Sequence, residues 1–180
     1  MSQLSSVSQN VLTQAAQSYL AEATPAPQRT RAWWLRLLST SDSVLPALLR
    51  ITLGGVILGH GLQKVFGWFG GYGIDGTMKF FASVGMPSVL GGLVIISDAL
   101  GSLGLIAGFL TRFSAAAAFA VMLGAILLVH GPNGFFMNWG GAPRGEGYEF
   151  HLLAMAMAAC LVLSGGGRAS LDGWLARKLG

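Results

Sequence analysis

The feature that most constrains this chain is a set of four long apolar runs, each holding at most one Asp, Glu, Lys or Arg. They cover residues 44–62, 88–110, 113–129 and 148–163. A helix needs roughly 20 mostly apolar residues to cross the hydrocarbon core of a bilayer. The runs therefore predict an all-α fold, an integral membrane four-helix bundle.

Composition supports a membrane environment. Of the 180 residues, 53% are hydrophobic and only 10% are charged, whereas soluble domains carry about 25% charged residues. So few charges cannot cover a water-facing surface of this size, and membrane lipids are the expected surroundings. The 27 glycines would let helix backbones approach closely. Glycine-lined helix faces also permit a homo-oligomer without requiring one.

The distribution of basic residues predicts the topology. Net charge is +4, but the basic residues flank apolar runs, which argues against nucleic-acid binding. Cytoplasmic segments are enriched in Lys and Arg. One side would hold eight basic residues and the other three, which predicts an inner-membrane protein with both termini in the cytoplasm. The smaller group is Lys64, Lys79 and Arg144.

Two parts of the chain are expected. Residues 1–43 read as a polar, flexible cytoplasmic arm, and residues 44–175 as the membrane domain. Between the first two spans, Ile74–Val84 has the composition of a short helix lying at the interface. The loops 67–87 and 131–147 would face outward.

Asp98 is the most informative polar residue. It lies in the second run, roughly 16–21 Å from either end of a helix, where an ionised carboxylate costs about 2.5–3.5 kcal/mol. It should therefore be paired or protonated. Two interpretations stay open: a proton acceptor beside a redox ligand, or an interhelical bond that stabilises the bundle. Pairing with Arg50 would require a tilted packing.

A second polar group lies near the outer end of the first run. His60, Gln63 and Lys64 are spaced i, i+3 and i+4, so they share one helical face. They could form an interfacial polar cap, with Lys64 reaching the headgroups. Alternatively, His60 and Lys64 could bind the polar head of a ligand such as a quinone.

A third polar group lies in or beside the second outward loop. Its members are His130, Asn133, Asn138, Glu146, Glu149 and His151. His60 and His130 end their spans at similar depth, so a bis-His haem is conceivable, although nothing requires it. No HxxxH or Cys/His cluster is present and Cys160 is a single cysteine, so no metal site is predicted.

Several short motifs, taken in order, resemble the DoxX family. They are Leu49-Arg50, Gly59-His60-Gly61-Leu62-Gln63-Lys64, Thr111-Arg112, Pro132-Asn133-Gly134-Phe135-Phe136, Tyr148-Glu149-Phe150 and Gly167-Arg168-Ala169-Ser170-Leu171-Asp172. The resemblance covers about residues 44–175. It implies a four-helix membrane bundle and a link to membrane redox complexes. The family usually has Glu where this chain has Asp98, so the carboxylate is kept with a shorter reach.

The leading hypothesis is a quinone-linked redox component, with quinone as the cofactor. If the chain is an enzyme, the resemblance implies a quinone-dependent oxidoreductase of the thiosulfate:quinone type. Electrons would come from a substrate or from a redox partner on the outer face. Candidate catalytic residues are Asp98, His60 and Glu149, and candidate quinone-binding residues are His60, Gln63, Lys64, His130 and Asn133.

Two other functions fit the same residues. A non-catalytic scaffold or accessory subunit would use its polar groups to hold the bundle together, and its outer loops to dock a redox enzyme. A small-molecule or lipid transporter is the third hypothesis, although the spans hold few charges to line a path.

Overall fold

The apolar runs form helices in the computed structural model, which describes residues 14, 38, 40–141, 143 and 145–179. The first helix, α3, spans Leu45–Phe66 and carries Pro46 in its first turn, where a missing N–H costs no hydrogen bond. It ends at Gly67, which has a φ of +72°. No strand occurs among the described residues, so the predicted all-α class is confirmed.

The second long helix is continuous but changes its winding. It consists of α5 (Ser88–Ile96), a π-helical turn η2 (Ser97–Gly101) and α6 (Ser102–Ala107), together 20 residues. A π-turn inserts a residue into the helical repeat and often occurs at functional sites. Here the turn holds Asp98, the one charged residue of the helix.

The third and fourth runs form an adjacent helical pair. Helix α7 spans Thr111–Ala125 and continues through a second π-turn, η3 (Ile126–His130), and a 3₁₀ turn, η4 (Gly131–Asn133). Helix α8 spans Glu149–Ser164. By length and composition, three helices could cross a membrane. With 16 residues, α8 reaches about 24 Å, so its role as a fourth span stays a prediction.

Short helices lie between and after the long ones. The 3₁₀ turn η1 (Trp68–Gly70) and α4 (Gly73–Ser83) follow α3, where the sequence predicted a short helix over residues 74–84. At the end of the chain, α9 covers Leu171–Leu179. Most of the predicted arm, residues 1–43, lies outside the described residues.

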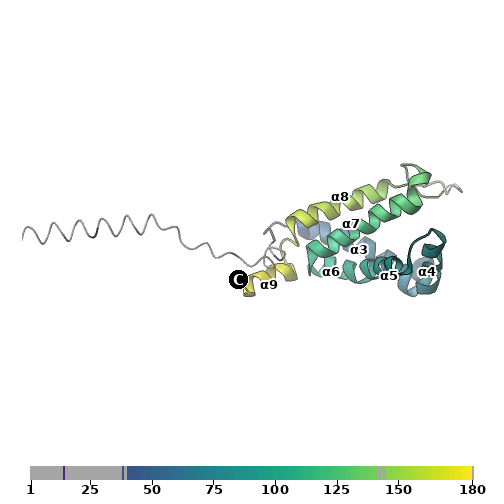
Figure 1. The fold of residues 1–180 in the computed structure, drawn as a ribbon. Coiled ribbons are helices and arrows are strands. Elements are labelled where there is room, and N and C mark those ends of the chain that lie inside the picture. Colours follow the sequence, from purple (N-terminus) through teal and green to yellow (C-terminus); the bar gives the residue numbers. More distant parts are fainter. Residues whose placement is uncertain (1–13, 15–37, 39, 142, 144, 180) are drawn as a thin grey trace, which may run out of the picture. The chain divides into compact units, whose positions relative to one another are not determined.

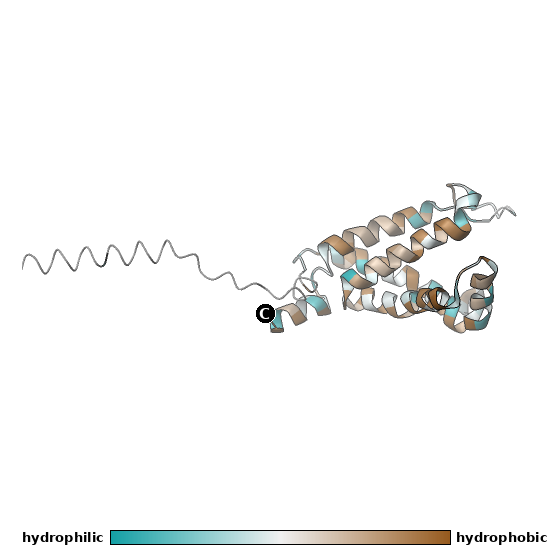
Figure 2. Cartoon of the chain, viewed as in Figure 1, coloured by the Kyte–Doolittle hydropathy of each residue, from teal (hydrophilic) through white to brown (hydrophobic). Residues whose placement is uncertain are grey.

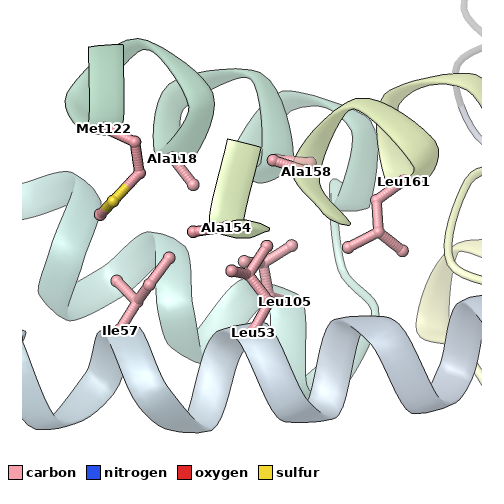
Figure 3. Close-up of a cluster of buried hydrophobic side chains, with 9 residues drawn as sticks. Leu53, Ile57, Leu105, Ala118, Met122, Ala154, Ala158 and Leu161 are labelled. Carbon is pink, nitrogen blue, oxygen red and sulfur yellow. The ribbon is translucent and has the colours of Figure 1, made fainter. Parts of the chain in front are cut away.

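The long helices pack around a core of small and aliphatic side chains. Helix α7 runs beside α8, and α3 contacts α6, η2 and α8 (Figure 1). The core lies between these helices (Figure 3) and includes Leu53, Ile57, Leu105, Ala115, Ala118, Met122, Ala154, Ala158 and Leu161. Alanines on α7 and α8 allow close backbone approach, which favours helix association in lipid.

The outward faces of the same helices are also apolar. Hydrophobic residues run along the long helices, while hydrophilic ones gather on the short helices and loops at their ends (Figure 2). Large side chains such as Val89, Phe113, Leu153 and Leu163 are 68–79% exposed. An exposed apolar surface of this extent fits a lipid environment, so the chain is a membrane protein.

A buried arginine fastens one end of the bundle. The Arg50 guanidinium is 3% exposed and donates to carbonyls of the second helix (Leu105, 3.3 Å, and Ile106) and of the loop before α9 (Gly166, 2.9 Å, and Ala169, 2.8 Å). Arg50 therefore stabilises the fold at this end of the bundle. The sequence analysis had considered Asp98 as its partner, but the structure gives it backbone carbonyls instead.

Asp172 completes the same end. Its two carboxylate oxygens accept the backbone N–H groups of Leu110 and Thr111, both at 2.8 Å. These N–H groups open α7 and have no partner within their own helix. Asp172 thus caps α7 from α9, which gives the Gly167–Asp172 motif a structural role.

Candidate functional site

A salt bridge joins the first and second helices at the other end of the bundle. Lys64 Nζ lies 2.8 Å from Asp98 Oδ2, and the two side chains are 23% and 2% exposed. The second carboxylate oxygen, Oδ1, is buried without a hydrogen-bond partner among the described residues. A buried polar atom normally has a partner, so this oxygen has capacity for one more donor.

Close packing of two backbones positions the pair. A Cβ on Gly61 would lie 2.5 Å from the carbonyl oxygen of Asp98, so only glycine allows this contact. Asp98 therefore lies level with Gly61, which is 16 residues after Leu45, or about 24 Å along α3. The carboxylate is thus level with the last two turns of α3, within reach of Lys64 one turn further on.

Lys64 also borders a cavity. The cavity has a volume of about 220 Å³ and lies between the end of α3 and α4, lined among others by Gln63, Lys64, Tyr72, Thr77, Phe80 and Phe81. It is smaller than the roughly 300–1,000 Å³ of pockets for drug-sized ligands. Its size and its mixture of aromatic and polar walls suit a single ring with polar substituents.

His60 lies beside this cavity and faces α8. Its Nδ1 is 3.2 Å from Gln63 Oε1, and Gln63 Nε2 donates to the Phe69 carbonyl at 3.3 Å. On the other side, the His60 ring lies 6.2 Å from the Phe150 ring of α8. His60 therefore links Gln63, which lines the cavity, with Phe150 in the α7–α8 half of the bundle.

Two further histidines meet in that half. The rings of His130, in η3, and His151, in α8, are 4.2 Å apart. His151 is 7% exposed, and its Nδ1 has no hydrogen-bond partner among the described residues. His130 Nδ1 lies 2.8 Å from the Glu146 carbonyl. The Phe150 ring lies 5.7 Å from the His151 ring and 6.2 Å from the His60 ring, so Phe150 stands between His60 and the histidine pair.

The predicted site residues Glu149 and Asn133 have loop-forming contacts. Glu149 Oε1 accepts the Met137 N–H at 2.9 Å, and Asn133 Nδ2 donates to the Glu146 carbonyl at 2.9 Å. Both bonds fold the loop 134–147 back over the start of α8. These two residues shape the loop and are not part of the Lys64–Asp98 pair.

The comparisons with known proteins agree with this architecture. Residues 45–131, from the start of α3 to the beginning of η4, match the model of the DoxX family. The chain contains a DoxX domain. His60, Gln63, Lys64, Asp98 and His130 all lie within the matched residues.

The alignment with one curated relative is longer than the matched DoxX region. The chain is 28% identical over 125 residues to a protein of Bacillus subtilis (strain 168) named "Putative oxidoreductase CatD". The alignment covers 69% of this chain and 82% of the relative. No solved structure matches the chain significantly.

The sequence did not predict two of the contacts described above. Lys64 was expected either to join an interfacial polar cap or to bind a ligand, with the first span ending at residue 62, whereas α3 continues to Phe66 and Lys64 pairs with Asp98. His151 was noted without a role, because a lone buried histidine gives no sign of its neighbour. Within the part of the chain that the structure describes, no three His, Cys, Asp or Glu residues are placed to hold a metal ion.

Proposed function

We propose that this DoxX-domain protein is a quinone-linked redox component of an inner-membrane oxidoreductase system. One observation carries the proposal: the Lys64–Asp98 pair, at 2.8 Å, leaves Asp98 Oδ1 without a partner, while Lys64 lines a small, partly aromatic cavity. Lys64 offers a donor to a quinone ring in this cavity, and Asp98, bonded to Lys64, offers a buried carboxylate next to that donor.

The residues fit the chemistry of quinone reduction. A bound quinone would take up two electrons and two protons to become a quinol, and the electrons would come from a reduced substrate or a partner subunit. Lys64 would donate a hydrogen bond to a ring oxygen and stabilise the negative charge that develops there. Asp98 and His60 would hold and pass the protons.

The histidine pair supports a route for these protons. His130 contacts both the Glu146 carbonyl and His151, and Phe150 lies between His151 and His60. A neutral imidazole has one ring nitrogen that donates a hydrogen bond and one that accepts, so it can take up a proton on one nitrogen and release it from the other. Protons would then enter from the outer face, consistent with the proposed topology in which both termini are cytoplasmic.

The test is quinone-dependent turnover in membrane vesicles that contain the protein, with thiosulfate as donor and a short-chain quinone as acceptor. Quinol formation would be followed by ultraviolet absorbance. We expect Asp98→Asn to lower turnover by about 100-fold or more, the typical contribution of an acid–base group. The matched control is Asp75→Asn, since Asp75 is an exposed carboxylate on α4. Unchanged turnover in Asp98→Asn would count against the proposal.

A scaffold function is the second candidate, because the outer loop exposes aromatic side chains. Phe136 is 74% and Trp139 is 91% exposed, and exposed aromatics are common in protein interfaces. Replacing residues 135–144 with a Gly/Ser linker should then release a copurifying redox enzyme. Under the quinone proposal, the same replacement would leave the ion pair and its bound ring in place.

A further inference from the structure

A second concave surface lies close to the proposed quinone site, on the other side of His60. It is a groove of about 540 Å³ between the start of α8 and the loop that folds back over it. Its walls are almost entirely apolar and include Phe135, Met137, Trp139, Phe150, Leu152 and Leu153. Its dimensions and chemistry suit a flexible hydrocarbon chain.

Hydrogen bonds hold the loop wall of the groove in place. The Glu149 N–H donates to the Phe135 carbonyl at 2.9 Å, and the Met137 N–H donates to Glu149 Oε1 at 2.9 Å. The Phe135 ring also packs edge-on against Tyr148, with centroids 5.6 Å apart. Since Glu149 lies in the lining and is bonded to the loop backbone, it supports the wall while the remaining lining is hydrocarbon.

The groove opens to the lipid-facing side of α8. Leu152 and Leu153 are 42% and 68% exposed, so a chain in the surrounding bilayer could enter without crossing a polar surface. Transfer from bilayer to groove gains little hydrophobic energy, because lipid tails are as apolar as leucine. Selection of a chain must therefore come from close packing and from attachment to a group bound nearby.

Continuity with the ion-pair site supplies that attachment. Phe150 lines the groove and contacts His60 at a ring separation of 6.2 Å. His60 in turn lies 3.2 Å from Gln63, which lines the cavity beside Lys64. His60 thus lies between a small, partly polar cavity and an apolar groove, an arrangement that matches a ring carrying a long tail.

We infer that the groove binds the prenyl tail of the quinone whose ring occupies the Lys64 cavity. This inference rests on the proposed function and adds the class of quinone: long-tailed and membrane-resident, rather than small and water-soluble. His60, which contacts Phe150 of the groove and Gln63 of the cavity, would lie between the ring site and the tail site.

The experiment uses the full-length protein in nanodiscs and a quinone with a photoactivatable diazirine at the end of its prenyl tail. After illumination, crosslinked peptides are identified by mass spectrometry. We expect labelling within residues 135–139 and 150–153, and its loss when an excess of unlabelled prenylquinone is present. Leu153→Trp should abolish this labelling by filling the groove. Leu163→Trp is the matched control, because Leu163 is an exposed leucine near the other end of α8.

A second measurement separates the groove from the ring site. Binding of a tail-less quinone should be unchanged in Leu153→Trp and lost in Lys64→Met. Failure of the tail-less quinone to bind the wild type would contradict the proposed function itself. If it binds but the tail probe labels other regions, the groove inference alone is overturned. Labelling by an acyl-chain phospholipid probe that excess quinone does not displace would assign the groove to lipid and also overturn it.

Discussion

Lys64 and Asp98 depend on one another, because each would be an uncompensated charge in an apolar bundle without its partner. Removing one member of a buried ion pair typically costs about 3–5 kcal/mol, whereas replacing both is often nearly neutral. The Lys64–Asp98 contact has the short distance and low exposure to which this applies. Substitutions at these two residues can therefore separate a structural role from a functional one.

A double-mutant cycle tests this coupling. Lys64→Met should destabilise the protein by about 3 kcal/mol or more, because Asp98 is left buried and unpaired. Adding Asp98→Asn should recover most of the loss, while quinone binding stays absent. The measurement is thermal unfolding in detergent for the two single variants and the double variant. Additive losses in the double variant would show that the two residues do not interact.

For Arg50 we predict an effect on stability and none on quinone binding. Arg50→Lys should destabilise the fold, because one ammonium cannot reproduce a planar fork that bonds four carbonyls on two segments. We expect a clearly lower unfolding temperature for Arg50→Lys, and tail-less quinone binding that is retained below that temperature. Loss of binding in a protein that is still folded would mean that Arg50 belongs to the site.

The contact between α3 and η2 is the element-scale feature on which the site depends. A Cβ at position 61 would meet the backbone of Asp98 and Ala99 at 2.5–2.9 Å. Gly61→Ala should therefore push the two helices apart, at a cost of about 1–3 kcal/mol for overpacking, and weaken quinone binding. Thermal unfolding and ligand titration report the two effects.

The neighbouring Gly59 is the control for this substitution. Nothing lies within 4 Å of a Cβ added there, and alanine is the better helix former by about 1 kcal/mol. Gly59→Ala should thus leave stability unchanged or raise it, with normal binding. Equal losses in both variants would show that helix flexibility, rather than the close contact, is what matters.

The sequence was most informative about the positions of the long helices. Long apolar runs located the long helices, because the bilayer allows few alternatives to a helix. Helix ends were harder to predict: the polar His60–Lys64 segment resembles an interfacial cap, yet α3 continues through it to Phe66. The π-turn at Asp98 was not predicted, because the sequence carries no signal for it.

The residues of the candidate site could be singled out from the sequence, but their pairing could not. Asp98 stood out as a charge inside an apolar run, and Lys64 because it shares a helical face with His60 and Gln63. Their partnership depends on the level at which α3 crosses the second helix, which Gly61 sets through a backbone contact. The meeting of His130 with His151 likewise depends on how η3 and α8 pack together, and spacing along the chain does not reveal it.

At the scale of the whole molecule, the positive-inside distribution predicts which end faces the cytoplasm. In a background where the free Cys160 is replaced by Ala, Asp75→Cys on α4 should react with a membrane-impermeant maleimide in intact cells. Lys178→Cys on α9 should react only after the cells are opened. The opposite labelling pattern would invert the topology and place the ion-pair end on the cytoplasmic side.

The central claim is that the cavity beside the Lys64–Asp98 pair holds a quinone. The most direct test is to purify the protein in mild detergent, extract it with organic solvent and identify every extracted small molecule by mass spectrometry. We predict a quinone in about stoichiometric amount, lost in Asp98→Asn and kept in Asp75→Asn. An extract that contains phospholipids alone, from a folded wild-type protein, would contradict the claim and favour the scaffold function.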